Sequence, residues 1–196
     1  RVGLDIGDVL SLRGVPGAEG GDIHKAATHG AYAFCVFFLI RHGPENLFII
    51  SRTDSGRWHT SHKGHQIEAW VVRFVRSLGV FVLGVPTQNM HICTNRSGAD
   101  GKGPYARNCR LTHMVDDHLE CLWSVFEDSF GNSNRHITEN SGFLVHFTGR
   151  PEGGSWMTRT LKPYVHETRD FSQIARWLDC YPGDAPWDWL SLSGPP

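Results

Sequence analysis

The sequence has no long apolar run, no excess of charge of one sign and no closely paired cysteines. Its most apolar segment, residues 31–40, is too short to cross a bilayer, so we expect no membrane association. A formal net charge of −1 argues against general nucleic-acid binding, which requires a basic surface. The 5 cysteines are widely spaced and include no C-x-x-C pair, which indicates reduced thiols. With no signal-peptide pattern at the start, we expect a cytoplasmic location.

Internal repeats and low-complexity tracts are also lacking. The 196 residues, 40% of them hydrophobic and 20% charged, are enough to bury one sizeable core. We therefore expect a single domain over residues 1–180. Residues 181–196 are rich in proline, glycine and tryptophan and show no periodicity, so we interpret them as a C-terminal tail.

The sequence does contain a regular alternation of apolar and amphipathic segments. Short apolar stretches predict strands at residues 2–6, 46–51, 90–93, 111–115 and 142–147. Helices are expected at residues 24–42, 66–78, 104–110, 118–126 and 170–180, mostly from the spacing of apolar side chains. Glycine-rich residues 11–22 predict a flexible loop. This alternation favours an α/β fold, a Rossmann-like parallel five-stranded sheet with helices on both faces.

The first predicted strand leads directly into an acidic, glycine-containing turn. Val2, Leu4 and Ile6 suit burial in a central strand. Parallel sheets bind ligands at the carboxyl ends of such strands, which places Asp5 at the mouth of a crevice with Asp8 close behind. The segment is equally consistent with a strand that simply ends in a turn. The other strand ends decide between these interpretations.

Polar side chains lie at or near the ends of other predicted strands. Ser51 ends the second strand, and Lys102 lies in the glycine-rich loop before the fourth. Asp116 and Asp117 follow the fourth strand. If the strands are parallel, these groups converge on one edge of the sheet. Carboxylates from different strands suit a hard cation such as Mg²⁺, whereas a hydroxyl and an ammonium suit a phosphoryl group.

The order of these segments resembles a known superfamily. Residues 4–10 (LDIGDVL), the strand end at residues 49–51, Lys102 and residues 112–117 (THMVDD) are similar to the four ordered motifs of the haloacid dehalogenase-like (HAD) superfamily. The resemblance covers roughly residues 2–147, and the last predicted helix would complete the fold. It implies an Mg²⁺-dependent phosphoryl hydrolase or transferase that acts on a phosphorylated substrate through an aspartyl nucleophile.

The resemblance also implies a role for each matching residue. Asp5 would be the nucleophile and would also bind the metal. Ser51 and Lys102 would hold the phosphate, and Lys102 would take part in catalysis. Asp117 would support the metal shell or pair with Lys102. The metal-binding set that follows is Asp5, Gly7 (through its carbonyl), Asp116 and Asp117.

The chain departs from the phosphatase pattern at Gly7. Phosphatases of this superfamily usually carry a second aspartate two residues after the nucleophile, as the general acid/base for the leaving group. Here the aspartate comes one residue later, at Asp8, which is the catalytic candidate for this role, although on an extended segment that shift turns a side chain to the opposite side. General acid/base catalysis contributes about 10²–10⁴ in rate. The alternative is therefore a catalytically degenerate HAD-like protein that acts as a binding or regulatory module.

Little of the sequence is left over for a cap domain. Residues 11–46 and 52–101 are expected to hold only elements that the core itself requires, so we expect no large cap. The resemblance then implies an open site, used on macromolecular phosphates or covered by a neighbouring subunit in an oligomer.

Polar residues 52–63 are predicted to form a loop at the rim of the site. Arg52 in this loop would meet an anionic substrate. His59, His62 and His65 have a spacing that favours zinc binding only on a helix, so a solvated loop is the preferred interpretation. His113 is expected to point into the core and His118 to begin a helix.

Overall fold

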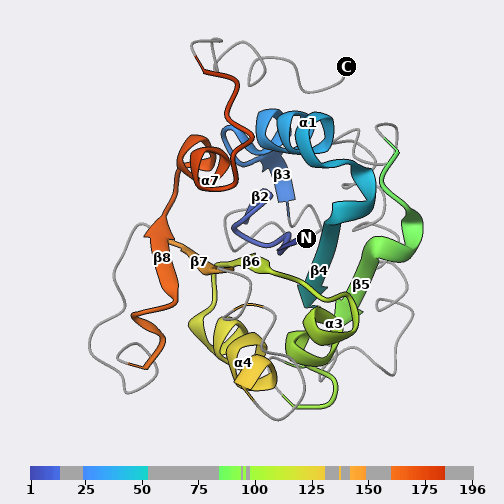
Figure 1. The fold of residues 1–196 in the computed structure, drawn as a ribbon, viewed down its shortest axis with the longest axis vertical. Coiled ribbons are helices and arrows are strands. Elements are labelled where there is room, and N and C mark those ends of the chain that lie inside the picture. The colour runs from blue at the N-terminus through green and yellow to red at the C-terminus, as the bar shows by residue number, and fades with distance from the viewer. Residues whose placement is uncertain are drawn as a thin grey trace.

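The computed structural model describes residues 1–13, 24–52, 84–93, 95, 98–130, 137, 142–148 and 160–183. In these ranges the chain forms an α/β fold around one six-stranded sheet (Figure 1). The strands are β1 (Val2–Leu4), β4 (Leu47–Arg52), β5 (Met90–Cys93), β6 (His113–Asp116), β7 (Leu144–Phe147) and β8 (Val165–Thr168). All neighbouring strands run parallel. The parallel, Rossmann-like α/β architecture expected from the sequence is confirmed.

The strand order places β1 at the centre of the sheet. The order is β5-β4-β1-β6-β7-β8, so the chain first adds strands on one side of β1 and then on the other. Doubly wound sheets have this arrangement, and their ligands bind at the carboxyl ends of the strands where the order reverses. The reversal here lies at β1 and its neighbour β6.

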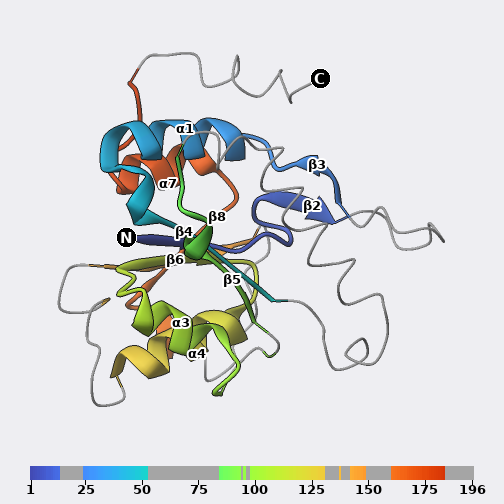
Figure 2. The same ribbon diagram turned by 90° about the vertical axis from the view of Figure 1, so that its right-hand side faces the viewer.

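Helices cover both faces of the sheet (Figure 2). Helices α1 (Ala31–His42) and α7 (Phe171–Trp177) lie on one face, and α3 (Lys102–Asn108) and α4 (Leu119–Phe130) lie on the other. Short 3₁₀ helices, η1 (Pro44–Asn46) and η3 (Thr87–Asn89), directly precede β4 and β5.

Each face of the sheet has its own apolar core. Toward α1 and α7, the ring centroid of Phe171 lies 5.2 Å from that of Phe34 and 4.9 Å from that of Phe147. Toward α3 and α4, Met114 and Leu144 are fully buried. Successive strand residues alternate between the two cores, as the pleat of a sheet requires. Because both faces are covered, the central strands are continuously apolar rather than alternating.

The predicted number of sheet strands was wrong by one. The sixth strand, β8, lies at the edge of the sheet and pairs only with β7. Its sequence is VHET, and His166 and Glu167 are exposed. The buried strands were predicted from their apolar runs. A half-exposed edge strand has no such run and was therefore missed.

The predicted loop was wrong at residues 11–13, and the predicted helix start at residue 24 was also wrong, whereas residues 14–22 lie outside the described ranges. Strands β2 (Ser11–Arg13) and β3 (His24–Ala27) form a two-stranded antiparallel sheet between β1 and α1. Helix α1 begins only at Ala31, after Gly30 with a φ of 77°. The apolar spacing of α1 continues backward through Ala27, but pairing with β2 decides the conformation there.

Several sequence predictions fall outside the described residues and stay predictions. They concern the helix at residues 66–78, the cluster of His59, His62 and His65, most of the C-terminal tail, and the absence of a large cap. Of the helices in the described ranges, none combines the length and apolar character needed to cross a membrane.

Candidate active site

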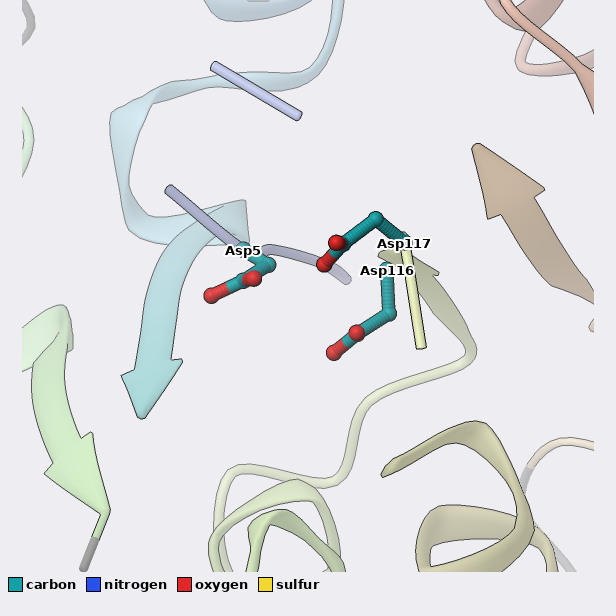
Figure 3. A group of neighbouring side chains, drawn as sticks. All are labelled: Asp5, Asp116 and Asp117. Carbon is teal, nitrogen blue, oxygen red and sulfur yellow. The ribbon is translucent and has the colours of Figure 1, made fainter. Parts of the chain in front are cut away.

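Three carboxylates meet at the carboxyl ends of β1 and β6 (Figure 3). Asp5 follows β1, Asp116 is the last residue of β6, and Asp117 comes next. The parallel register pairs Leu4 with Val115, and the Asp5 N–H donates to the Val115 carbonyl at 3.0 Å. One oxygen from each carboxylate lies within 4.8 Å of the other two. The group therefore forms where the strand order reverses.

Lys102 provides the counter-charge for two of these carboxylates. Its Nζ donates to Asp116 Oδ2 at 2.6 Å and forms an ion pair with Asp5 Oδ1 at 2.8 Å. The lysine side chain is only 1% exposed. Burial alone would lower the pKa of Lys102, but attraction to the carboxylates of Asp116 and Asp5 raises it above its ordinary value. Lys102 is therefore a permanent cation.

The carboxylates outnumber the lysine that neutralises them. Burial raises the pKa of Asp116 to about 6, although the charge of Lys102 acts in the opposite direction. Asp116 Oδ1 accepts a hydrogen bond from the His118 N–H at 2.9 Å. Asp5 is 5% exposed, and its Oδ1 contacts the Lys102 ammonium at 2.8 Å. The site thus has more negative charge than Lys102 neutralises, and its carboxylates offer further oxygen acceptors.

These features fit a hard divalent cation. Mg²⁺ prefers oxygen ligands and is usually bound by one or two carboxylates together with waters and substrate phosphates. Asp5, Asp116 and Asp117 can offer such ligands from one side. The Lys102 ammonium contacts Asp5 and Asp116, and a divalent cation would reduce the remaining repulsion among the three carboxylates.

Ser51 and Arg52 lie at the same edge of the sheet. Ile49 of β4 pairs with Leu4, so Ser51 is two positions farther along β4 and beside the end of β1. Ser51 is buried, and Arg52, the last residue of β4, is half-buried. Their position suits an anion at the carboxylate edge, although neither belongs to the carboxylate group itself.

Gly7 and Asp8 lie in the turn that follows β1. Both are half-buried, and Asp8 has a left-handed backbone with a φ of 54°. The chain here is not extended, so the alternation of a strand does not set the direction of the Asp8 side chain. Asp8 is nevertheless outside the group of three carboxylates that the described residues form.

His146 lies beside the carboxylate group and was not predicted from the sequence. This residue of β7 is 0% exposed and pairs in register with Asp116. Its Nε2 lies 3.2 Å from the Asp117 carbonyl oxygen, and its Nδ1 lies 3.7 Å from Glu167 Oε1 on β8. The only signal in the sequence was a polar residue within an otherwise apolar strand, LVHF.

The two histidines considered from the sequence occupy opposite ends of β6. His113 begins the strand, and its ring packs edge-on against Phe143 at 4.3 Å between centroids. His118 directly precedes α4, and its Nε2 lies 3.5 Å from Asp117 Oδ2. His118 is therefore the histidine at the border of the site.

Comparison of the chain with protein-family models, with curated proteins and with solved structures gave no match.

Proposed function

We propose that this protein is an HAD-like, Mg²⁺-dependent phosphoryl hydrolase or transferase with Asp5 as its nucleophile. The observation that supports this most is the buried Lys102 between Asp5 and Asp116, with Asp117 in the same group. A purely structural ion pair needs one carboxylate for each ammonium, and additional buried charge is costly. The surplus of carboxylates at the strand-order reversal is better explained by a site that binds a cation and a phosphate.

The reaction begins with Asp5. One carboxylate oxygen attacks the phosphorus of a phosphate ester, a new O–P bond forms, and the bond from phosphorus to the ester oxygen breaks. The ester oxygen leaves with the bonding electrons and takes up a proton. Water then attacks the phosphorus of the aspartyl phosphate, which releases inorganic phosphate, restores the Asp5 carboxylate and yields a proton. If an alcohol replaces water, the outcome is transfer instead of hydrolysis.

Lys102 and Ser51 are assigned to the phosphoryl group. The ammonium of Lys102 balances the negative charge of the transferring phosphoryl oxygens, and the Ser51 hydroxyl donates a hydrogen bond to one of them. Asp5, Asp116 and Asp117, together with the Gly7 carbonyl, would hold Mg²⁺, which would supply further charge neutralisation. Arg52 adds attraction for an anionic substrate from the end of β4.

The chain offers no carboxylate at position 7 to protonate the leaving group. Asp8 is the nearest replacement in sequence and lies in the same turn. A site in which Asp8 does not reach the leaving group loses the roughly 10²–10⁴-fold contribution of general acid/base catalysis. We therefore expect slow turnover of substrates with poor leaving groups and measurable turnover of activated aryl phosphates.

A screen of aryl phosphates in the presence of Mg²⁺ tests this proposal. The parent protein is compared with Asp5→Asn and Gly7→Asp. We expect Asp5→Asn to abolish turnover and Gly7→Asp to increase it by up to about 10²–10⁴-fold. Parent activity that Asp5→Asn leaves unchanged would show that the mechanism is wrong.

Gly7 also supports the second candidate, a catalytically degenerate HAD-like protein that binds rather than hydrolyses. This function predicts an inactive parent that still binds Mg²⁺. A gain of turnover in Gly7→Asp, abolished by adding Asp5→Asn, would identify such a disabled phosphatase.

A further inference from the structure

His146 is a buried polar side chain near the carboxylate group. The proposed chemistry does not explain its role. On the sheet it lies between two acidic residues, paired in register with Asp116 on β6 and with Glu167 on β8. Its side chain is 1% exposed, whereas that of Glu167 is 41% exposed. Leu144, Val145 and Phe147, the other residues of β7, are all apolar and buried. A histidine in this position requires hydrogen bonds that leucine would not.

The hydrogen bond of His146 to Asp117 fixes the arrangement of the ring. A backbone carbonyl oxygen can only accept, so the Nε2 atom, 3.2 Å away, must carry the hydrogen and donate it. In the neutral ring Nδ1 is then an acceptor, and no described residue donates to it. The nearby Glu167 oxygen, 3.7 Å from Nδ1, is itself an acceptor when ionised. The polar contact that defines the ring is therefore the one with Asp117.

Two of the hydrogen bonds that hold the segment after β6 act in different ways. The His118 N–H donates to Asp116 Oδ1 at 2.9 Å, and His146 Nε2–H donates to the Asp117 carbonyl. The first contact links the segment to itself, whereas the second ties it to the neighbouring strand β7. The second therefore helps to fix the Asp117 backbone relative to the sheet, and with it the direction in which the Asp117 carboxylate leaves the chain.

We propose that His146 is a positioning residue that holds Asp117 in the geometry required for Mg²⁺ binding. This inference rests on the proposed function, since the orientation of Asp117 matters for binding only if the carboxylate group takes a cation. Hydrogen bonds behind metal ligands orient those ligands, and their loss typically costs 10–100-fold in metal affinity. If His146 merely filled the core, its substitution would change the stability of the protein and leave its affinity for Mg²⁺ unchanged.

The test is calorimetric titration of the whole chain with Mg²⁺. His146→Gln keeps a donor that can reach the same carbonyl, whereas His146→Leu keeps similar bulk without a donor. We expect His146→Gln to bind Mg²⁺ nearly as tightly as the parent, and His146→Leu to bind about 10–100-fold more weakly. Glu167→Gln is the matched control, because Glu167 approaches Nδ1 and not Asp117. It should leave the affinity unchanged.

Nitrogen NMR of the parent provides a second measurement that needs no substitution. The ring of His146 should be in the Nε2–H form. An Nδ1–H tautomer would overturn the inference, as would parent-like Mg²⁺ affinity in His146→Leu. The inference also fails if His146→Gln melts like the parent yet loses as much affinity as His146→Leu.

Asp5→Asn separates this inference from the function on which it rests. If the parent binds no Mg²⁺, or if Asp5→Asn binds it as tightly as the parent, the proposed function fails and the inference fails with it. If Asp5→Asn loses binding while His146→Leu retains it, the metal site stands and only the role of His146 is wrong.

Discussion

At the scale of single residues, Lys102 has the most unusual environment in the described structure. It is a fully buried cation whose ammonium contacts two carboxylates from different strands. Removing one partner of a buried ion pair is strongly destabilising, since it leaves uncompensated charge in the interior. The consequences of removing Lys102 are therefore specific enough to test.

We predict that Lys102→Met lowers the free energy of unfolding by about 3–5 kcal/mol in the absence of divalent cations. Added Mg²⁺ should restore part of this loss, because a cation bound by Asp5 and Asp116 replaces the missing positive charge. Thermal unfolding with and without Mg²⁺ measures both effects. Lys162→Met, at an exposed lysine, is the matched control and should change neither value. Equal stabilisation of parent and Lys102→Met by Mg²⁺ would contradict the expectation.

His113 predicts a dependence of stability on pH. Burial lowers its pKa from 6.5 to about 4, so the folded protein disfavours the charged ring. The unfolded chain takes up a proton near pH 6.5, and the folded chain does so only near pH 4. Stability is therefore complete above pH 6.5 and falls as the pH decreases from 6.5 to 4, by up to about 3 kcal/mol from this residue.

Replacing His113 by phenylalanine should remove this contribution and keep the aromatic contact with Phe143. Denaturant unfolding at several pH values between 4 and 7 measures the difference between parent and His113→Phe. The parent should lose more stability than the variant on acidification. Parallel curves would show that His113 is not the group responsible.

At the scale of secondary-structure elements, two glycines determine how closely the strands approach their neighbours. A Cβ at Gly142, just before β7, would overlap the backbone carbonyl oxygen of Thr112. A Cβ at Gly3 in β1 would lie 2.6 Å from Leu111 Cδ1 and 2.7 Å from Met114 Sδ, which are ends of flexible side chains. The backbone at Thr112 cannot move aside, whereas the side-chain ends of Leu111 and Met114 can.

We therefore predict that Gly142→Ala destabilises the protein more than Gly3→Ala. Overpacking a close contact typically costs about 1–3 kcal/mol, and Gly142→Ala should lie at or above the upper end of this range. Denaturant unfolding of both variants gives the comparison directly. If Gly3→Ala were the more damaging change, Met114 and Leu111 would have to be less able to move than the backbone at Thr112.

The elements that the sequence revealed are those with strong apolar patterns. The segments that became β1, β4 and β7 are mostly apolar because both of their faces are covered, and α1 shows its buried face in Phe34, Cys35 and Phe38. The β2–β3 pair and β8 were missed because their pattern is weak or polar. In those segments hydrogen bonds to a neighbouring strand decide the conformation, and local sequence does not encode that neighbour.

At the scale of the whole molecule, the strand order brings the chemical groups together. Asp5 and Asp116 are far apart in sequence but become neighbours because β6 pairs with β1. The sequence could indicate which groups lie near strand ends. It could not indicate which strands adjoin, nor that Lys102 would lie between these two carboxylates. His146 was missed for a similar reason, because its partner is the backbone carbonyl of Asp117, just after the adjacent strand.

The most direct test of the central claim is to locate a phosphoryl group on the protein after incubation with an acyl phosphate and Mg²⁺. Without a carboxylate at position 7 to assist hydrolysis, an aspartyl phosphate at Asp5 should persist long enough for mass spectrometry of acid-stabilised peptides. We predict Mg²⁺-dependent labelling of the peptide that contains Asp5, and its loss in Asp5→Asn. Labelling of a different residue, or labelling that survives in Asp5→Asn, would contradict the assignment of Asp5 as the nucleophile.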